Sequence, residues 1–265
     1  MELWTLIENS SSTAQLRAEH GLSLYLKVNG QIVLFDAGQT DSFVTNAEQL
    51  GLDLAEADLA VLSHGHYDHS GGLLAFLERN STAKVYVNPH VFEPHYNALD
   101  KDIGVDPRLQ QYGDRLCFAG DGQVIGEGLT LFSCNSREPV VPICPYGLSM
   151  EQEGERLPED FRHEQYLWIE EGQKRILISG CSHKGILNLV HWFWPDVLVG
   201  GFHFMKLDPD HPQDAAVLEQ SARQLLAYPT VYYTGHCTGE RQFSFLKERM
   251  GDRLHPISAG YHLVL

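Results

Sequence analysis

The stretch Leu62-Ser63-His64-Gly65-His66-Tyr67-Asp68-His69-Ser70-Gly71-Gly72 follows a short apolar run and places three imidazoles and a carboxylate within six residues. At the end of a strand, alternate side chains project together, so His64 and His66 can bind one ion. The chain then turns and presents Asp68 and His69 to a neighbouring ion. These ligand types suit Zn²⁺, Fe or Mn, whereas a purely structural polar turn would gain little from them. The stretch therefore predicts two adjacent divalent ions.

The sequence around this motif predicts two sheets with helices outside. LSLYLKV and QIVLF flank Asn29-Gly30, which favours a two-residue hairpin turn, and QYLWIEE with KRILISG indicates a second hairpin. Each hairpin is followed by alternating helical and strand-like segments. The pattern is typical of a two-sheet sandwich with outer helices.

The length favours one compact domain spanning residues 1–265. Within it, residues 137–161 form a long stretch without clear periodicity. Such a stretch is often a lid or a substrate loop, and an ordinary surface excursion is the alternative.

The composition excludes several classes of protein. A formal net charge of −16 would repel a nucleic-acid backbone, although bound cations can attract a small anion locally. No apolar run approaches the roughly 20 residues that span a bilayer, and no signal peptide is evident, so we expect no membrane association and a cytoplasmic protein. The five cysteines contain no CxxC pair, which favours a reducing compartment.

HxHxDH after an apolar strand, with Phe35-Asp36-Ala37-Gly38 upstream, resembles the metallo-β-lactamase superfamily over most of the chain. Three later segments resemble its branch of dihydropterin ribofuranosyl-aminobenzene phosphate synthase-like proteins. They are Gly180-Cys181-Ser182-His183-Lys184-Gly185-Ile186, Gly200-Gly201-Phe202-His203 and Gly235-His236-Cys237-Thr238-Gly239. The resemblance implies an α+β fold, a four-layer αββα sandwich. Its metals would lie between the ends of the two sheets, with two zinc ions expected and iron or manganese as alternatives.

The resemblance also implies which later residues complete the site. The superfamily's third and fifth motifs each supply a histidine, and the best matches are His163 and His236. The fourth motif normally supplies a bridging Asp, and Cys181 stands in that position here. The first ion would be held by His64, His66 and His163, and the second by Asp68, His69 and His236.

Four residues have roles that the sequence leaves open. Cys181 is either a thiolate ligand or a neutral buried thiol, which would leave a single-metal or loosely bridged site. His183 is either a replacement ligand or a group that contacts substrate, and His203 lies at the same predicted rim. The resemblance suggests that Asp36 orients the histidines from behind.

The leading functional hypothesis is hydrolysis of a small, possibly anionic, ester, phosphoester or related substrate by metal-activated water. Asp68 would orient the nucleophile or receive its proton, and His183 would act as an acid or contact a substrate oxygen. One alternative is a synthase or transferase acting on a pterin-like or phosphorylated substrate. Another is a non-enzymatic, metal-stabilised protein that binds a metabolite. The oligomeric state is left open.

Overall fold

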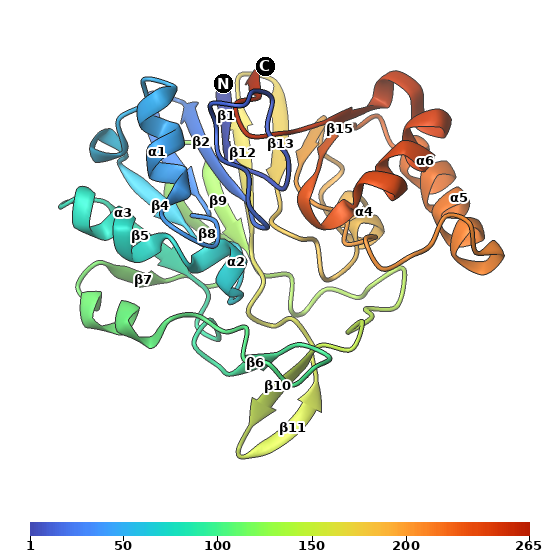
Figure 1. Cartoon of the computed structure of the whole chain (residues 1–265), viewed down its shortest axis with the longest axis horizontal. Helices are drawn as coiled ribbons and strands as arrows, with labels where there is room; N and C mark the ends of the chain where they lie inside the picture. The colour runs from blue at the N-terminus through green and yellow to red at the C-terminus, as the bar shows by residue number, and fades with distance from the viewer.

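Two seven-stranded sheets lie face to face in the computed structural model, which describes residues 1–265 (Figure 1). The first has the order β17-β1-β2-β3-β4-β5-β7, and the second β16-β15-β14-β13-β12-β9-β8. The strands of the first sheet are β1 (Glu2–Ile7), β2 (Ser23–Val28), β3 (Gln31–Phe35), β4 (Leu59–Val61), β5 (Lys84–Val87), β7 (Leu116–Phe118) and β17 (His262–Val264). Those of the second are β8 (Gln123–Gly126), β9 (Leu129–Phe132), β12 (Tyr166–Glu171), β13 (Lys174–Ile178), β14 (Val197–Val199), β15 (Val231–Thr234) and β16 (Leu254–Pro256).

Helices cover the outer face of each sheet (Figure 1). None of them is both long and apolar enough to cross a membrane. The α-helices are α1 (Ser42–Gln49), α2 (Tyr67–Ser70), α3 (Leu73–Arg79), α4 (Ile186–Phe193), α5 (Pro212–Leu226) and α6 (Glu240–Met250). Short 3-10 turns are η1 (Leu54–Glu56), η2 (Pro107–Tyr112), η3 (His236–Thr238) and η4 (Gly251–Arg253).

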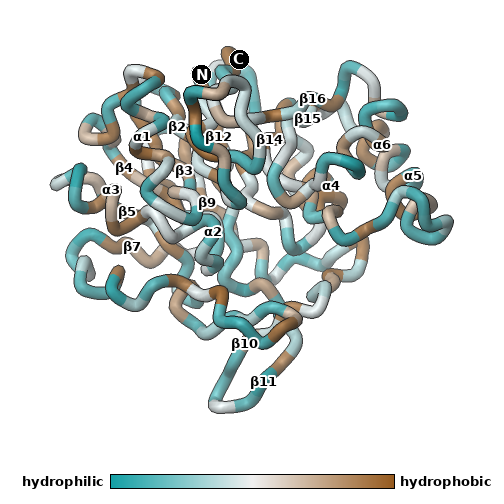
Figure 2. The backbone as a smooth tube through the Cα atoms, in the orientation of Figure 1, coloured by the Kyte–Doolittle hydropathy of each residue, from teal (hydrophilic) through white to brown (hydrophobic).

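Three buried apolar clusters show that the elements form four layers. One cluster lies between the sheets and joins side chains such as Phe35 from the first to Leu131 from the second. A second packs Phe43 and Phe76 of α1 and α3 against the first sheet, and a third packs α4, α5 and α6 against the second. In Figure 2 the hydrophobic colour is concentrated in these interior strands and inner helix faces. The fold is therefore the α+β sandwich that the sequence predicted.

Both predicted hairpins are present. β2 pairs antiparallel with β3 around Asn29 and Gly30, whose φ angles of 48° and 72° suit the positive-φ turn expected for Asn-Gly. β12 pairs antiparallel with β13. The strand before the motif, β4, ends at Val61. The backbone N–H of Ser63 donates to the Asp36 carboxylate instead of to a neighbouring strand.

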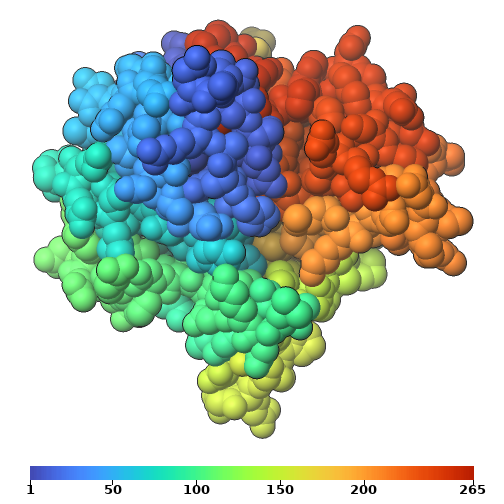
Figure 3. Space-filling view, viewed as in Figure 1, coloured from blue at the N-terminus to red at the C-terminus, as the bar shows by residue number.

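The segment 137–161 is more regular than predicted. Its second half forms a hairpin of β10 (Ser149–Gln152) and β11 (Glu155–Pro158), which pairs with β6 (His95–Tyr96) in a small third sheet. This hairpin projects from the body of the molecule (Figure 3). A role as a lid stays a prediction.

Candidate metal centre

The predicted ligands meet at one end of the two sheets. The motif lies in the loop and short helix after β4, and Cys181 and His183 follow β13. His203 follows β14, and His236 follows β15. Because β13, β14 and β15 are parallel, their carboxyl ends share one edge. The histidines gathered there are all buried: His64, His66, His69, His163, His183, His203 and His236.

Asp36 fixes two of these histidines from behind. Its carboxylate accepts hydrogen bonds from the backbone N–H of Ser63 at 2.7 Å, the Ser63 hydroxyl at 2.8 Å and Nδ1 of His69 at 2.7 Å. Since the Ser63 hydroxyl gives its proton to Asp36, its oxygen accepts from Nδ1 of His64 at 2.7 Å. Both imidazoles therefore carry a proton on Nδ1 and keep a lone pair on Nε2.

His236 is held in the same tautomer by residues that follow β1. Oδ1 of Asn9, which also accepts from the backbone N–H of Gly21, lies 2.9 Å from Nδ1 of His236. The Glu8 carboxylate accepts the backbone N–H of His236 at 2.5 Å. Nε2 of His236 therefore presents its lone pair to the site.

The free nitrogens face one another in pairs. Nε2 of His69 lies 3.1 Å from Nε2 of His236, and Nε2 of His64 lies 3.3 Å from Nε2 of His183. Two lone pairs at such distances repel each other unless a proton or a cation lies between them. Two nitrogens bound tetrahedrally to zinc at about 2.0–2.1 Å would be about 3.3 Å apart. The residues present therefore fit divalent transition-metal ions.

Asp68 and Cys181 add two ligand atoms beside the second pair. Oδ2 of Asp68 lies 3.4 Å from Nε2 of His236 and 3.8 Å from Nε2 of His69. The Cys181 sulfur lies 3.2 Å from Nε2 of His69. Burial raises the pKa of the Cys181 thiol well above its ordinary value, so a thiolate here requires a nearby cation. Ligation by Cys181 stays a prediction.

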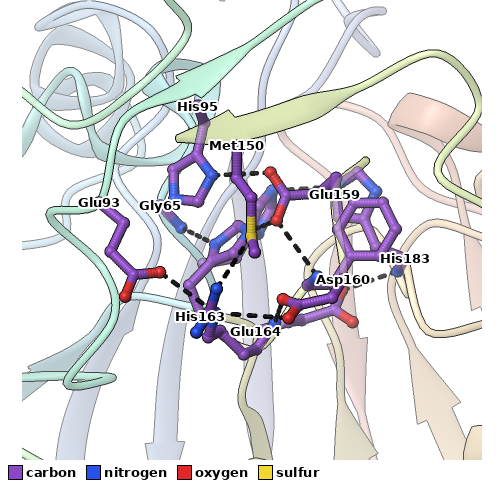
Figure 4. Close-up of polar contacts among 12 residues, drawn as sticks. Gly65, Glu93, His95, Met150, Glu159, Asp160, His163, Glu164 and His183 are labelled. Carbon is purple, nitrogen blue, oxygen red and sulfur yellow. Dashed lines mark hydrogen bonds and ion pairs between the residues drawn. The ribbon is translucent and has the colours of Figure 1, made fainter. Parts of the chain in front are cut away.

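His163 lies beside His66, with the two ring centres 5.2 Å apart. Figure 4 shows it near Gly65 and Glu159, which contact its two ring nitrogens. Its Nδ1 accepts the backbone N–H of Gly65 at 2.8 Å, so its proton is on Nε2, which lies 3.5 Å from the Glu159 carboxylate. The same carboxylate lies 2.7 Å from Nδ1 of His95. A Cβ on Gly65 would lie 2.6 Å from the backbone oxygen of Val91, so the motif needs glycine there. These side chains support the motif loop.

His183 is a second candidate for the third ligand of the first ion. The ligand atoms of His64, His66 and His183 all lie within 4.8 Å of one another. The Glu164 carboxylate holds the loop, because it accepts the backbone N–H of His183 at 2.8 Å and that of Lys184 at 3.0 Å. His163 meets the same distance criterion together with His66, His95 and Glu159, so the third ligand of the first ion stays a prediction.

Four residues at this edge have a strained backbone. Asp36, Ser182, His203 and His236 have φ angles of 58°, 55°, 56° and 49°, in the left-handed region that residues other than glycine rarely adopt. Each such conformation costs about 1–3 kcal/mol. The surrounding hydrogen bonds therefore hold the loops in one conformation, as a preorganised site requires.

An open pocket of about 300 Å³, called the mouth below, lies over the predicted metal ligands. His20, Asp68, His183, His203 and His236 line it, and Lys206 is the one lysine or arginine side chain in its wall. Nε2 of His20 lies 3.3 Å from Asp68, and the His20 side chain is 44% exposed. Asp68 is thus connected to solvent through a titratable group.

Comparison with known proteins shows which family the chain resembles. The sequence profile of the metallo-β-lactamase superfamily matches residues 16–143, which include the whole motif. The crystal structure of a metal-dependent hydrolase of the β-lactamase superfamily superimposes with a TM-score of 0.82, at 27% identity over 100% of this chain and 99% of that one. Residues 16–143 therefore resemble the metallo-β-lactamase superfamily, and the whole chain has the fold of the metal-dependent hydrolase. Superfamily members bind divalent metals, often zinc, and most are metal-dependent hydrolases.

Other relatives resemble the chain over most of its length. The 7,8-dihydropterin-6-methyl-4-(β-D-ribofuranosyl)-aminobenzene-5'-phosphate synthase of Methanocaldococcus jannaschii is 26% identical over 98% of this chain and 95% of its own. An uncharacterised protein of the same organism is 29% identical over 78% of this chain and 81% of its own. Zinc-bound PqqB from Methylobacterium extorquens, at 13% identity over the full length of both chains and a TM-score of 0.60, shares the fold.

Several supporting residues of this site were not predicted from the sequence. Glu159 and Glu164 lie in and just after a segment that was interpreted as an insertion, and His20 has no motif spacing. Glu8 and Asn9 do carry a signal, because they are polar residues directly after an apolar strand, as Asp36 is. This pattern predicts that Glu8 and Asn9 lie at the end of a strand, but it does not predict which histidine they contact.

Replacing Asp36 with Asn should weaken metal binding about 10–100-fold, because an amide cannot accept the same hydrogen bonds from Ser63 and His69. Competition with a chromophoric zinc chelator measures the affinity. Asp58→Asn is the matched control, since the Asp58 carboxylate accepts only the backbone N–H of Ile32, away from the site. Equal affinities for the Asp36 and Asp58 variants would contradict the positioning role.

The metal-free protein should lose stability as the pH falls from about 6.5 to about 4. Burial, aided by the nearby His95, lowers the pKa of His163 from 6.5 to about 4. Between these pH values the His163 side chain is protonated in the unfolded chain and neutral in the folded chain. This group therefore lowers the free energy of unfolding by about 1.4 kcal/mol for each unit by which the pH falls. Urea unfolding at several pH values measures the slope. A His163→Gln variant should have a shallower slope, and an unchanged slope would exclude the effect.

Proposed function

We propose that the protein is a metal-dependent hydrolase that cleaves a small ester, phosphoester or related bond. The observation that supports this best is the pairing of free Nε2 atoms, His64 with His183 and His69 with His236, at 3.3 and 3.1 Å. Bound divalent ions would lower the pKa of water to about 7 and polarise the scissile oxygen. Two zinc ions, or iron or manganese, suit these ligands.

We assign the ligands from the observed geometry. The first ion would be held by His64, His66 and His183, and the second by Asp68, His69 and His236. Cys181 lies beside the second set, with its sulfur 3.2 Å from His69. Its small side chain is less suited than a carboxylate to bridge two ions, so the second ion should be the more weakly held.

Asp68 is proposed as the residue that orients the attacking water and receives its proton. Its carboxylate reaches the mouth, with the side chain 13% exposed, and lies 3.3 Å from Nε2 of His20. His20 is therefore placed to carry the proton on to solvent. Across the mouth, His203 is buried with no hydrogen-bond partner on either ring nitrogen, so it can bind a substrate oxygen.

A second candidate is transfer to an acceptor other than water. It is favoured by the 26% identity to a synthase over 98% of the chain. The ligands and fold are compatible with either reaction, because fold alone does not determine chemistry.

One assay separates these candidates. The zinc-loaded protein is incubated with phosphodiesters, lactones, thioesters and pterin phosphates in ¹⁸O-labelled water. A hydrolase gives labelled product without any added acceptor, and chelation abolishes product formation. Product that forms only with an added acceptor and contains no label would favour the transferase. Full metal occupancy without turnover would contradict both and favour a metabolite-binding protein.

A further inference from the structure

A second cavity, of about 220 Å³, adjoins the mouth and shares His183 and His203 with it. Its walls come from the start of α4, one side of α5 and the segment 141–146. The two imidazole rings at the junction lie 4.3 Å apart, centre to centre. A molecule whose reacting bond lies at the metal centre can therefore extend past these rings into the cavity.

The cavity carries no formal charge. None of its lining residues is Asp, Glu, Lys or Arg, although 20% of the chain is charged. Ile186, Phe202 and Phe204 supply apolar and aromatic walls, and Gln220 and Gln224 supply uncharged polar groups at the open side. A charged ligand would lose its hydration here without gaining an ion pair, and this carries a large free-energy penalty.

Three ring nitrogens at the junction lack a partner. Both nitrogens of His203 and Nδ1 of His183 are buried without any hydrogen bond from the protein. His203 is 9% exposed, and its backbone has a left-handed φ of 56°. Each buried polar group without a hydrogen bond destabilises the folded protein by about 1–3 kcal/mol. A ligand that forms hydrogen bonds with these nitrogens would remove that penalty and therefore bind more tightly.

We propose that this cavity binds an uncharged, flat ring of the substrate, joined to the bond that reacts at the metal centre, through aromatic walls and hydrogen bonds to His203. The proposal deepens the proposed function and rests on it for the identity of the reacting bond. Planar rings suit walls formed by Phe202, Phe204, Tyr146 and the imidazoles, because offset and edge contacts between rings are favourable.

Binding of simple probes tests the cavity without requiring turnover. The probes are quinolin-2-one, an uncharged flat lactam, and its 4-carboxylate, titrated calorimetrically into the zinc-loaded protein. Val217, which is 47% exposed at the rim, is replaced by Trp to narrow the cavity. Ala216→Trp is the matched control, because Ala216 is exposed on the same helix and does not line the cavity.

We expect quinolin-2-one to bind the wild-type protein at least about tenfold more tightly than the carboxylate, and at least about tenfold more tightly than it binds the Val217→Trp variant. The Ala216→Trp variant should match the wild type. Equal affinity for both probes, no effect of Val217→Trp, or no binding up to the solubility limit would overturn the proposal. Ring binding without hydrolysis of any ester would contradict the proposed function alone, whereas hydrolysis without ring binding would contradict the cavity proposal alone.

Discussion

Replacing Asp68 with Asn is expected to lower kcat/KM by a factor on the order of 10²–10⁴ on any substrate that the zinc-loaded protein hydrolyses. The amide has nearly the same shape, but it cannot take a proton from water. It also weakens the contact with His69 and His236, whose Nε2 atoms lie 3.8 and 3.4 Å from the carboxylate. Initial rates at saturating zinc separate the loss of proton transfer from the loss of metal.

The control for this variant is Asp252→Asn, an exposed position in η4 far from the motif in the chain. Circular dichroism and thermal melting should show that both variants are folded. His20→Gln should reduce the rate less than Asp68→Asn and should make it more sensitive to buffer concentration, because small buffer bases can replace a proton carrier. Full activity of the Asp68 variant would contradict the proposed mechanism.

Removal of metal is expected to lower the melting temperature by roughly 10 °C. At a zinc concentration about 1,000 times the dissociation constant, binding contributes about 4 kcal/mol to the free energy of unfolding. For a chain of this length each kcal/mol shifts the melting temperature by about 2–4 °C. The physical source is the repulsion between the facing lone pairs of His69 and His236, whose Nδ1 atoms both donate to other groups.

Scanning calorimetry with zinc, with a chelator and with magnesium measures this effect. Magnesium prefers oxygen ligands, so it should leave the melting temperature of the chelated protein unchanged. In a His69→Asn variant the shift caused by zinc should shrink, because one of the two ions loses a ligand. If the chelated protein has the same melting temperature as the zinc-loaded protein, the facing imidazoles do not need a metal ion between them, and this prediction is wrong.

Local patterns predicted the parts of the fold that depend on neighbouring residues. Asn29-Gly30 determines a hairpin turn by itself, and apolar runs of strand or helix length gave the layers. The hairpin of β10 and β11 was missed because Met150 and Leu157 are its one large apolar pair, and all residues of β11 are exposed. Its formation depends on pairing with β6, which lies more than 50 residues earlier.

The sequence predicted those candidate ligands that lie close together in the chain. HxHxDH brings its side chains together through spacing alone, whereas the choice between His163 and His183 depends on tautomers. The backbone N–H of Gly65 forces the proton of His163 onto Nε2, and no sequence pattern reports that contact. The same limit applies to Asn9, which meets His236 only because β1 lies against the loop after β15.

The most direct test of the account is a crystal structure of protein purified without chelators, with anomalous data collected on both sides of the zinc, iron and manganese edges. We predict two peaks, one among His64, His66 and His183, and one among Asp68, His69 and His236. His163 should keep its hydrogen bond to Gly65 and remain outside both coordination spheres. The absence of any anomalous peak at these imidazoles, together with no metal in solution analysis, would contradict the central claim.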